Sequence, residues 1–339
     1  MGVGISLSGL AGAVASEGGV GVIATAGVGI HEPDAVKDFL AVNIRAMRDE
    51  IRRARELAAE GILGVNIMGV LTDYAKMVAA AVEEQIDVIF SGAGLPLSLP
   101  SLVPDKAKTK LVPIVSSARA AGLLIRKWIS SYKRPPDAIV IEGPKAGGHL
   151  GFTREQLDDP AYSLESLLPQ VLEQTEAARL KHGVTIPVIA AGGIYTGGDI
   201  AAIMDQGAAG VQMATRFVTT HECDADEAFK QSYIDAGPDD LEIIQSPVGL
   251  PGRAIKNHFI EEVAAGRRKP FRCIYHCITT CKMQEAPYCI AMALSNAKQG
   301  RMRGGFAFAG ENAPRATEII SVKDLMASLV SEYEEARGT

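Results

Sequence analysis

Seven short apolar runs, rich in β-branched residues, recur along this chain, and segments with helical periodicity separate them. One such segment, Thr72–Glu84, carries a single apolar stripe. Strands that are apolar throughout and alternate with amphipathic helices predict a parallel sheet covered on both faces. The predicted strands are Val20–Ile23, Gly64–Ile67, Val88–Ser91, Leu111–Val115, Ala138–Ile141, Val188–Ala191 and Gly210–Ala214.

Polar and glycine-rich segments follow the carboxyl ends of these strands, which is where a (β/α)8 TIM barrel builds its site. A doubly wound sheet would place a nucleotide fingerprint in its first βα turn, and Gly27-Val28-Gly29 matches that fingerprint poorly. The α/β fold we predict is therefore the TIM barrel. Because Met1–Ser6 resembles a loop that follows a strand, we expect the first barrel strand to be absent or trimmed.

The alternation of strands and helices stops between Val218 and Lys298, where several prolines, a basic run and four cysteines occur. We predict a mainly helical second domain at 218–298, inserted into a barrel formed by 1–217 and 299–339. The tail, Ser321–Ala336, is predicted to be an amphipathic helix capped by Ser321.

Charge and hydropathy exclude two classes of partner. The formal net charge of −6 argues against nucleic-acid binding, and no apolar run reaches membrane-spanning length. The amino-terminal segment is apolar, but it lacks a basic region and its first charge is Glu17, so we do not interpret it as a signal peptide. We expect a cytoplasmic protein.

Two neighbouring strand ends carry features of a phosphate site. Gly192 and Gly193 join a strand to a helix, and free amide N–H groups at a glycine turn and a helix start attract a phosphate dianion. Gln212-Met213-Ala214-Thr215 ends the next strand, and Thr215 offers a hydroxyl and an amide. An ordinary tight turn at Gly192 remains the alternative.

A histidine stands just past the strand Ala138–Ile141, in the segment Glu142–Gly151. The glycines Gly147 and Gly148 precede His149 and let the backbone approach a flat ligand closely. Because histidine exchanges protons near neutral pH, His149 over a flavin ring would remove a proton next to a nitro or carbonyl group, or donate one to an enolate-like intermediate. A structural histidine is the alternative.

Asn66 lies near the end of the strand Gly64–Ile67, where its amide needs hydrogen-bond partners. The pyrimidine edge of a flavin would supply them, and an Asn that caps a loop is the alternative.

Four cysteines, Cys273, Cys277, Cys281 and Cys289, follow a C-x3-C-x3-C-x7-C pattern. On a helix the first three would share one face, which suggests an iron–sulfur cluster or a zinc site. Buried cysteines without a ligand are the alternative. We expect Cys223 to be a packing residue.

Several of these segments, in this order, resemble the nitronate monooxygenase (2-nitropropane dioxygenase-like) family, whose superfamily includes flavin-dependent enoyl-acyl-carrier-protein reductases and NADH:quinone reductases. The resemblance rests on Gly147–Gly151, Ala191–Ile194, Gln212–Phe217 and Val248–Ala254.

The resemblance implies an FMN-containing TIM barrel with an inserted helical domain and with His149 as the catalytic base. Relatives often carry glutamine where Glu142 stands, and the better-known nitronate-oxidising enzymes do not require the cysteine cluster. The implied FMN-binding residues are Asn66, Glu142, Gly147, Gly192, Gly193, Gln212, Met213, Ala214 and Thr215.

Three functions remain open at this point. The first is an FMN-dependent oxidoreductase that oxidises alkyl nitronates with O2. The second is an NAD(P)H-dependent reductase of an enoyl thioester or a quinone, and the third is a non-catalytic module that binds a flavin or a cluster. We expect a small-molecule substrate, NAD(P)H or O2 as cosubstrate, and a homodimer.

Overall fold

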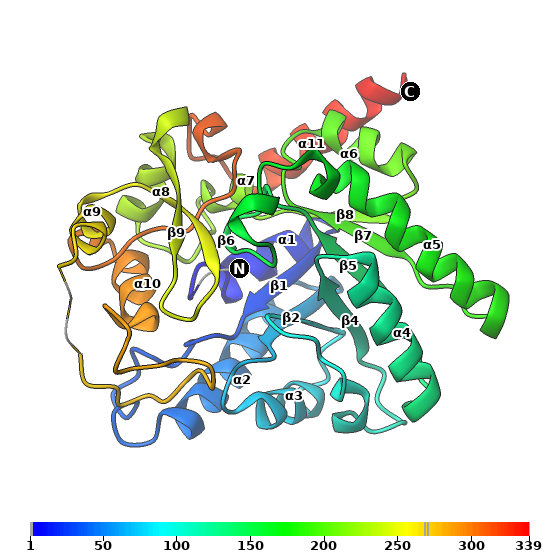
Figure 1. Ribbon diagram of the computed structural model, residues 1–339, viewed down its shortest axis with the longest axis horizontal. Coiled ribbons are helices and arrows are strands. Elements are labelled where there is room, and N and C mark those ends of the chain that lie inside the picture. The colour runs from blue at the N-terminus through cyan, green and yellow to red at the C-terminus, as the bar shows by residue number, and fades with distance from the viewer. Residues whose placement is uncertain (1–2, 268, 270, 339) are drawn as a thin grey trace.

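In the computed structural model, residues 3–267, 269 and 271–338 are described. Within them, the seven predicted strands form one parallel sheet in the order β1-β2-β3-β4-β5-β7-β8, which curls into a half-barrel (Figure 1). This arrangement confirms the predicted α/β barrel class. The strands are β1 (Val20–Ala24), β2 (Ile62–Met68), β3 (Val88–Gly92), β4 (Lys110–Val115), β5 (Ile139–Glu142), β7 (Val188–Ala191) and β8 (Gly210–Gln212).

Helices cover the outer face of this sheet, because alternate strand residues point outward and are apolar. Ile23, Val65, Ile89 and Ile141 are fully buried there. Trp128 packs in the same layer and donates from Nε1 to the carbonyl oxygen of Pro96 at 3.1 Å. The covering helices are α2 (Phe39–Leu57), α3 (Tyr74–Glu83), α4 (Ala118–Tyr132), α5 (Leu164–His182) and α6 (Gly197–Asp205).

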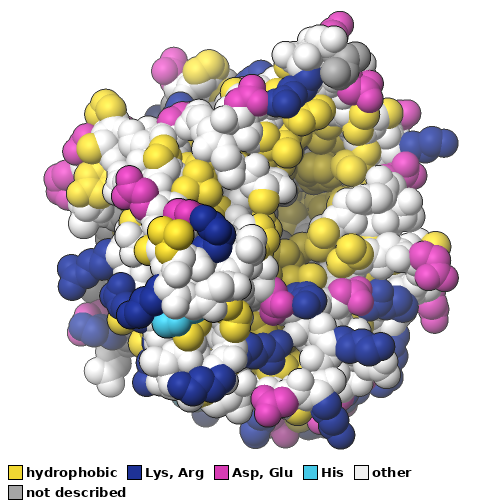
Figure 2. All heavy atoms as spheres, turned by 90° about the vertical axis from the view of Figure 1, so that its right-hand side faces the viewer, with side chains coloured by type: hydrophobic (Ala, Val, Ile, Leu, Met, Phe, Trp, Pro, Cys, Tyr) yellow, Lys and Arg dark blue, Asp and Glu magenta, His cyan; other side chains and the backbone are white. Residues whose placement is uncertain are grey.

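The inner face of the sheet has an apolar floor. Phe90, Val112, Val140 and Ala191 pack there in one cluster. Gly64 is required beside Phe90, since a Cβ at this position would lie 2.9 Å from the ring. A hollow lined with apolar side chains opens on the face between α5 and the carboxyl-terminal helix (Figure 2).

The helix α1 (Ser8–Ser16) lies against the outside of β1. The contact is so close that a Cβ at Gly21 would stand 1.8 Å from the carbonyl oxygen of Ala11. The open edge of β1 pairs with Ser6, whose carbonyl accepts from the Ala24 amide at 2.8 Å. No strand precedes β1 among the described residues, and Met1 and Gly2 lie outside them.

The segment 218–298 contains a β-hairpin that our sequence analysis did not predict. Its strands β9 (Leu241–Gln245) and β10 (Pro251–Ile255) form an antiparallel sheet with β6 (Gly148–His149). The signal was weak because β10 begins Pro-Gly and its partner β6 lies a hundred residues away in sequence. The helices α7 (Thr215–Val218), α8 (Glu227–Ile234), α9 (His258–Ala264) and α10 (Ile290–Lys298) surround the hairpin (Figure 1).

The helix expected under the cysteines does not form. Residues 271–289 have no helix where they are described. Instead, this segment crosses the loop after β2, where the Thr72 amide donates to the carbonyl of Cys277 and the Thr279 amide to that of Val70. These tertiary hydrogen bonds hold the segment extended, so the spacing of four does not place the thiols on one helical face.

The carboxyl-terminal helix α11 (Val322–Arg337) begins as predicted, with the Ser321 hydroxyl accepting from the Asp324 amide. It packs along α6 and places Glu332 at the start of that helix. No helix in the described residues is long and apolar enough to cross a membrane.

A partly buried carboxylate joins the segment 218–298 to the helix α1. Asp224 accepts from the amides of Leu7, Gly9 and Leu10 at 2.7, 3.1 and 3.1 Å. We expect Asp224→Ala to lower the free energy of unfolding by about 2–4 kcal/mol, because three partly buried donors lose a charged acceptor.

Urea unfolding followed by circular dichroism measures this change. Asp38→Ala is the matched control, since Asp38 caps α2 through one exposed bond, and we expect a loss of about 0.5–1 kcal/mol there. Equal losses in the two variants would contradict the bridging role of Asp224.

Candidate active site

Three polar side chains stand above the apolar floor, at the carboxyl ends of the strands. The strand register places Asn66 beside Phe90 and pairs Ala191 with both Glu142 and Gln212. Because paired residues of parallel strands share one face, all three polar side chains lie on the inner face of the sheet. Each of these residues was predicted to contact a cofactor. The structure brings all three to the same end of the sheet, at the carboxyl ends of its strands, which we call the mouth of the barrel.

None of the three side chains has a hydrogen-bond partner in the described part of the chain. The most informative case is Gln212, whose Oε1 is buried and unpaired. Buried polar atoms in native proteins nearly always have a partner, so an orphaned amide oxygen at the mouth of a barrel indicates a group that binds there.

Glu142 is the only one of the three with an ionisable side chain. Burial raises its pKa above the ordinary glutamate value, which favours the protonated form. A neutral carboxyl group, like the glutamine often found in relatives, both donates and accepts hydrogen bonds.

Glycines let four loops touch backbone to backbone beside these side chains. A Cβ at Gly147 would lie 2.6 Å from the Ala309 carbonyl carbon and the Gly310 nitrogen, and one at Gly310 would lie 2.5 Å from Thr215 Oγ1. Gly192 and Gly193 have φ of +89° and +85°, which only glycine adopts readily. We call this set, Gly147, Gly192, Gly193, Gly310 and Thr215, the glycine cradle.

The start of α6, predicted as part of the phosphate site, is already capped from within the protein. The Gly197 amide donates to Glu332 Oε2 at 2.7 Å, and Asp199 accepts from Tyr195 and Thr196. A phosphate would therefore rely on the cradle loops, where the amides of Gly193, Met213 and Ala214 donate to no acceptor among the described residues.

His149 lies on β6, across from the inserted hairpin. Its Nε2 is 2.7 Å from Ser246 Oγ, and its ring stands edge-on to Phe308 at 5.0 Å between centroids. Burial lowers the pKa of the imidazole to about 4. The ring is therefore neutral at physiological pH and keeps a nitrogen lone pair for accepting a proton.

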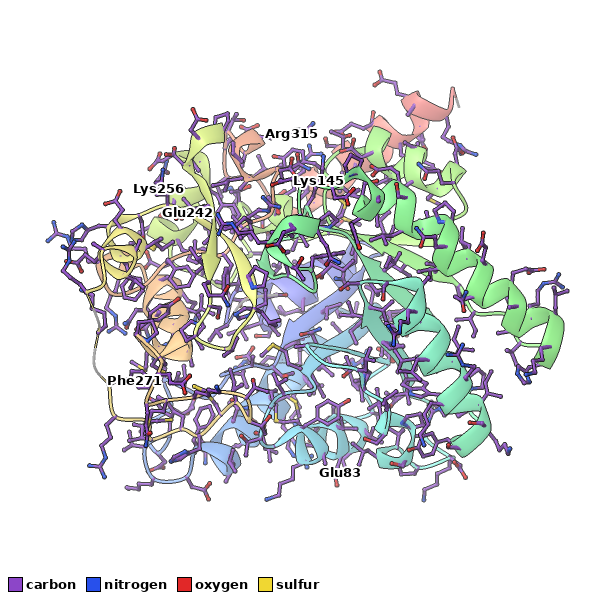
Figure 3. The ribbon with its side chains drawn as sticks, in the orientation of Figure 1. Glu83, Lys145, Glu242, Lys256, Phe271 and Arg315 are labelled. Carbon is purple, nitrogen blue, oxygen red and sulfur yellow. The ribbon has the colours of Figure 1, made fainter. Side chains whose placement is uncertain are left out.

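Sequence analysis missed Ser246 and Phe308, which hold His149, and Asn312, which donates to the Gly193 carbonyl at 2.8 Å. Each comes from a segment distant in sequence from the residue it contacts. Figure 3 labels Glu242 on β9 and Lys256 directly after β10, and it labels Lys145 and Arg315 in its upper part.

The cysteines do not form the predicted metal site. No group of three or more His, Cys, Asp or Glu side chains in the described residues is arranged to hold a metal ion. Burial, with a smaller effect of Cys289 and the other thiols, raises the pKa of Cys277 to about 12, so it stays protonated. Cys277 and Cys289 pack instead against the apolar cluster around Phe39 and Tyr275, and Cys223 is buried.

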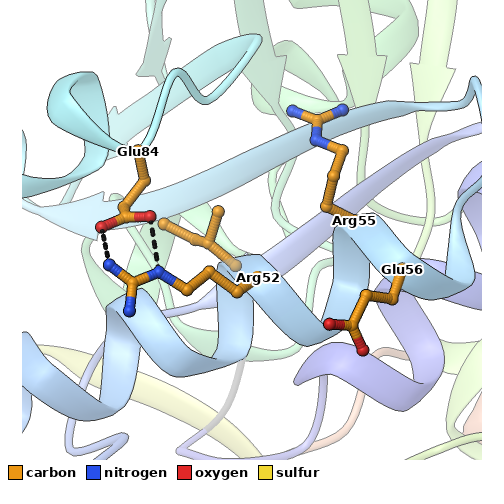
Figure 4. A pocket seen from close by; sticks show the side chains of 5 residues that line it. Arg52, Arg55, Glu56 and Glu84 are labelled. Atoms are coloured by element: carbon orange, nitrogen blue, oxygen red, sulfur yellow. Dashed lines mark hydrogen bonds and ion pairs between the residues drawn. The ribbon is translucent and has the colours of Figure 1, made fainter.

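A separate surface hollow lies between α2 and α3, far from the predicted site residues. It is lined by Ile51, Arg52, Arg55, Glu56 and Glu84 (Figure 4). Arg52 and Glu84 fill it with a bidentate ion pair at 2.7 and 2.9 Å. Because Arg52 and Glu84 pair with each other and Arg55 pairs with Asp87 at 2.9 Å, these three charges are already engaged.

Comparison with known proteins agrees with this geometry. Residues 1–332 match the nitronate monooxygenase family. The chain belongs to this family. It is 33% identical to a probable nitronate monooxygenase of Staphylococcus aureus over 54% of this chain and 47% of that protein. A Mycobacterium tuberculosis dehydrogenase that acts on an indene carboxyl-CoA is 28% identical over 76% of this chain and 62% of its own length.

Solved structures show the same fold over nearly the whole chain. FabK from Thermotoga maritima superposes with a TM-score of 0.75 at 27% identity, covering 98% of this chain and 91% of its own. A nitroalkane oxidase from Streptomyces ansochromogenes gives 0.72 at 25% identity, covering 100% and 95%. The chain spans 62% and 47% of the lengths of the two curated relatives that it matches.

The residues present fit FMN, the cofactor that the family resemblance implies. The orphaned oxygen of Gln212 suits the hydrogen-bonding edge of an isoalloxazine, as do the side chains of Asn66 and Glu142, which bind no described residue. The glycine cradle, with its free amides, suits a phosphate.

Cofactor uptake tests the cradle. Because Gly193 has a positive φ and a Cβ there would lie 3.0 Å from the Lys145 side chain, we expect Gly193→Ala to weaken FMN binding at least tenfold. Quenching of flavin fluorescence measures the dissociation constant.

Gly198→Ala is the matched control, since a Cβ at Gly198 meets nothing closer than Thr196 Oγ1 at 3.7 Å. Its FMN affinity should stay within twofold of the wild type. Equal affinity in all three proteins would refute the cradle.

Stability should depend on pH through His149. Its pKa is about 4 when folded against an ordinary 6.5, so between these values the unfolded chain binds more protons. The free energy of unfolding should therefore fall by about 3 kcal/mol more in the wild type than in His149→Gln as pH drops from neutral to acid. Urea titrations of both proteins across this range measure the difference, and parallel curves would contradict it.

Proposed function

We propose that this protein is an FMN-dependent oxidoreductase of the nitronate monooxygenase type, in which His149 accepts the proton of the substrate carbon. The observation that carries the proposal is a neutral, half-buried imidazole on the loop that continues from the cradle glycine Gly147. When bound, FMN supplies an acceptor for the substrate's electrons and a route for passing them to O2.

The contacts of His149 fit the role of a general base. A tautomer whose Nε2–H donates to Ser246 Oγ leaves the Nδ1 lone pair free, and no described residue binds this nitrogen. Phe308 packs against the ring and excludes water from one side. A base with a low pKa suits an acidic carbon, such as one next to a nitro group, because it is unprotonated at every working pH.

Paired substrates test this role. A neutral nitroalkane must lose a proton on the enzyme, whereas its nitronate has already lost it. We expect His149→Ala to lower turnover of nitroethane about 100-fold or more and to affect ethyl nitronate far less, measured as oxygen consumption by FMN-loaded protein. Ser246→Ala should give a smaller loss in the same direction.

Equal turnover of nitroethane by His149→Ala and the wild type would contradict the base role. Flavin absorption of each purified variant, recorded first, shows that the cofactor is bound and that the loss does not come from an empty site.

A thioester substrate is the second candidate, favoured by the similarity over 76% of this chain to a dehydrogenase of a carboxyl-CoA compound. The proton next to a thioester carbonyl would meet the same imidazole. Anaerobic mixing with NADH, NADPH, an acyl-CoA and a nitronate separates the candidates. Bleaching of the flavin by the nitronate alone supports the first, and bleaching by the pyridine nucleotides or the acyl-CoA but not by the nitronate replaces it.

A further inference from the structure

The side chain of Arg253 reaches from the hairpin to the loop that precedes His149. Its Nη2 donates to the Pro144 carbonyl at 2.8 Å and its Nε to the Ala146 carbonyl at 3.4 Å. These two carbonyls belong to the turn between β5 and β6, immediately before Gly147. One planar guanidinium therefore holds both ends of that turn.

The backbone of Arg253 lies at the same junction. It pairs with Gly148 in the antiparallel ladder, and its carbonyl accepts from the Ala309 amide at 3.1 Å. Arg253 thus contacts the loop that carries His149 and the segment whose Ala309 and Gly310 close the glycine cradle. No other described side chain donates to the carbonyls of this turn.

The guanidinium of Arg253 forms no ion pair with a described residue. No carboxylate among the described residues lies within 4 Å of its guanidinium, although Glu311 and Asp158 exert a weaker, longer-range attraction. A surface arginine usually finds a carboxylate or water. A half-buried one that binds only backbone carbonyls acts through the position of that backbone.

We propose that Arg253 is a positioning residue, whose guanidinium fixes the Pro144–Ala146 turn so that Gly147 and His149 hold their places against cofactor and substrate. This inference rests on the proposed function for its catalytic readout. Its readouts from backbone exchange and cofactor binding do not depend on which substrate is correct.

The test compares three variants of the FMN-loaded protein. Arg253→Met keeps the length of the side chain and removes its donors. Arg253→Lys keeps the charge, but a single ammonium cannot reproduce the fork that spans two carbonyls. Arg154→Met is the matched control, because Arg154 also donates to a backbone carbonyl, that of Ile243 on β9 at 3.1 Å, but not to one of the Pro144–Ala146 turn.

In Arg253→Met we expect kcat at saturating FMN to fall about 100-fold, since a displaced base loses its reactive geometry. FMN should bind about tenfold more weakly, and hydrogen exchange should quicken at residues 143–149. Water reaching His149 should also move the acid limb of the pH–rate profile upward from about 4, toward the ordinary histidine value of 6.5. Arg253→Lys should resemble Arg253→Met, and Arg154→Met should stay within twofold of the wild type.

Wild-type exchange at residues 143–149 in Arg253→Met would overturn the proposal, as would a wild-type kcat and pH profile once FMN is saturating. If Arg253→Met does not fold, Arg253→Lys decides alone, because full activity there would show that charge suffices without the fork. If the wild type binds FMN but turns over no substrate, the proposed function is wrong. The role of Arg253 is then still tested by hydrogen exchange at residues 143–149 and by the affinity for FMN.

Discussion

Close backbone contact between loops is the constraint on which the site depends. Gly147, Gly192 and Gly310 each stand where a single added carbon would meet a neighbouring main chain or hydroxyl. The loops after β5, β7 and β8 and the segment returning from the insertion can therefore interlock. This contact brings main-chain amides together in a small volume, where they can meet a dianion without a buried cation.

The strand ends of the parallel sheet and the segment 218–298 contribute different parts of the proposed site. The barrel supplies a rigid row of strand ends, on which Asn66, Glu142 and Gln212 stand above a packed floor. The insertion supplies the partners of His149, through the ladder from β6 to β10 and the hydroxyl of Ser246. A cofactor held by the strand ends and a base held by the segment 218–298 would meet where these two parts pack together. The position of the base relative to the cofactor would therefore depend on the geometry of that contact.

Electrostatics at this junction favour neutral groups. Burial lowers the pKa of the His149 imidazole and raises that of the Glu142 carboxyl, and each shift favours the neutral form of the side chain. Glu332 accepts from the Gly197 amide at the start of α6 and pairs with Arg216 at 3.0 Å. Burial likewise raises the pKa of Cys277, which packs against the apolar cluster around Phe39.

Local pattern was sufficient for the barrel. Apolar runs such as Ile139–Ile141 are buried on both faces, and helices with one apolar stripe cover them, so the seven strands and the fold class could be predicted from the chain alone. Residues that meet across long sequence separations were decided only by the fold. Sequence periodicity does not indicate such contacts. Examples are the hairpin β9–β10, the hydrogen bonds from Arg253 to the turn before His149, and the capping of α6 by Glu332. The cysteine spacing predicted a helix, but the segment instead forms hydrogen bonds with the loop after β2. These tertiary hydrogen bonds outweigh the weak local preference for a helix.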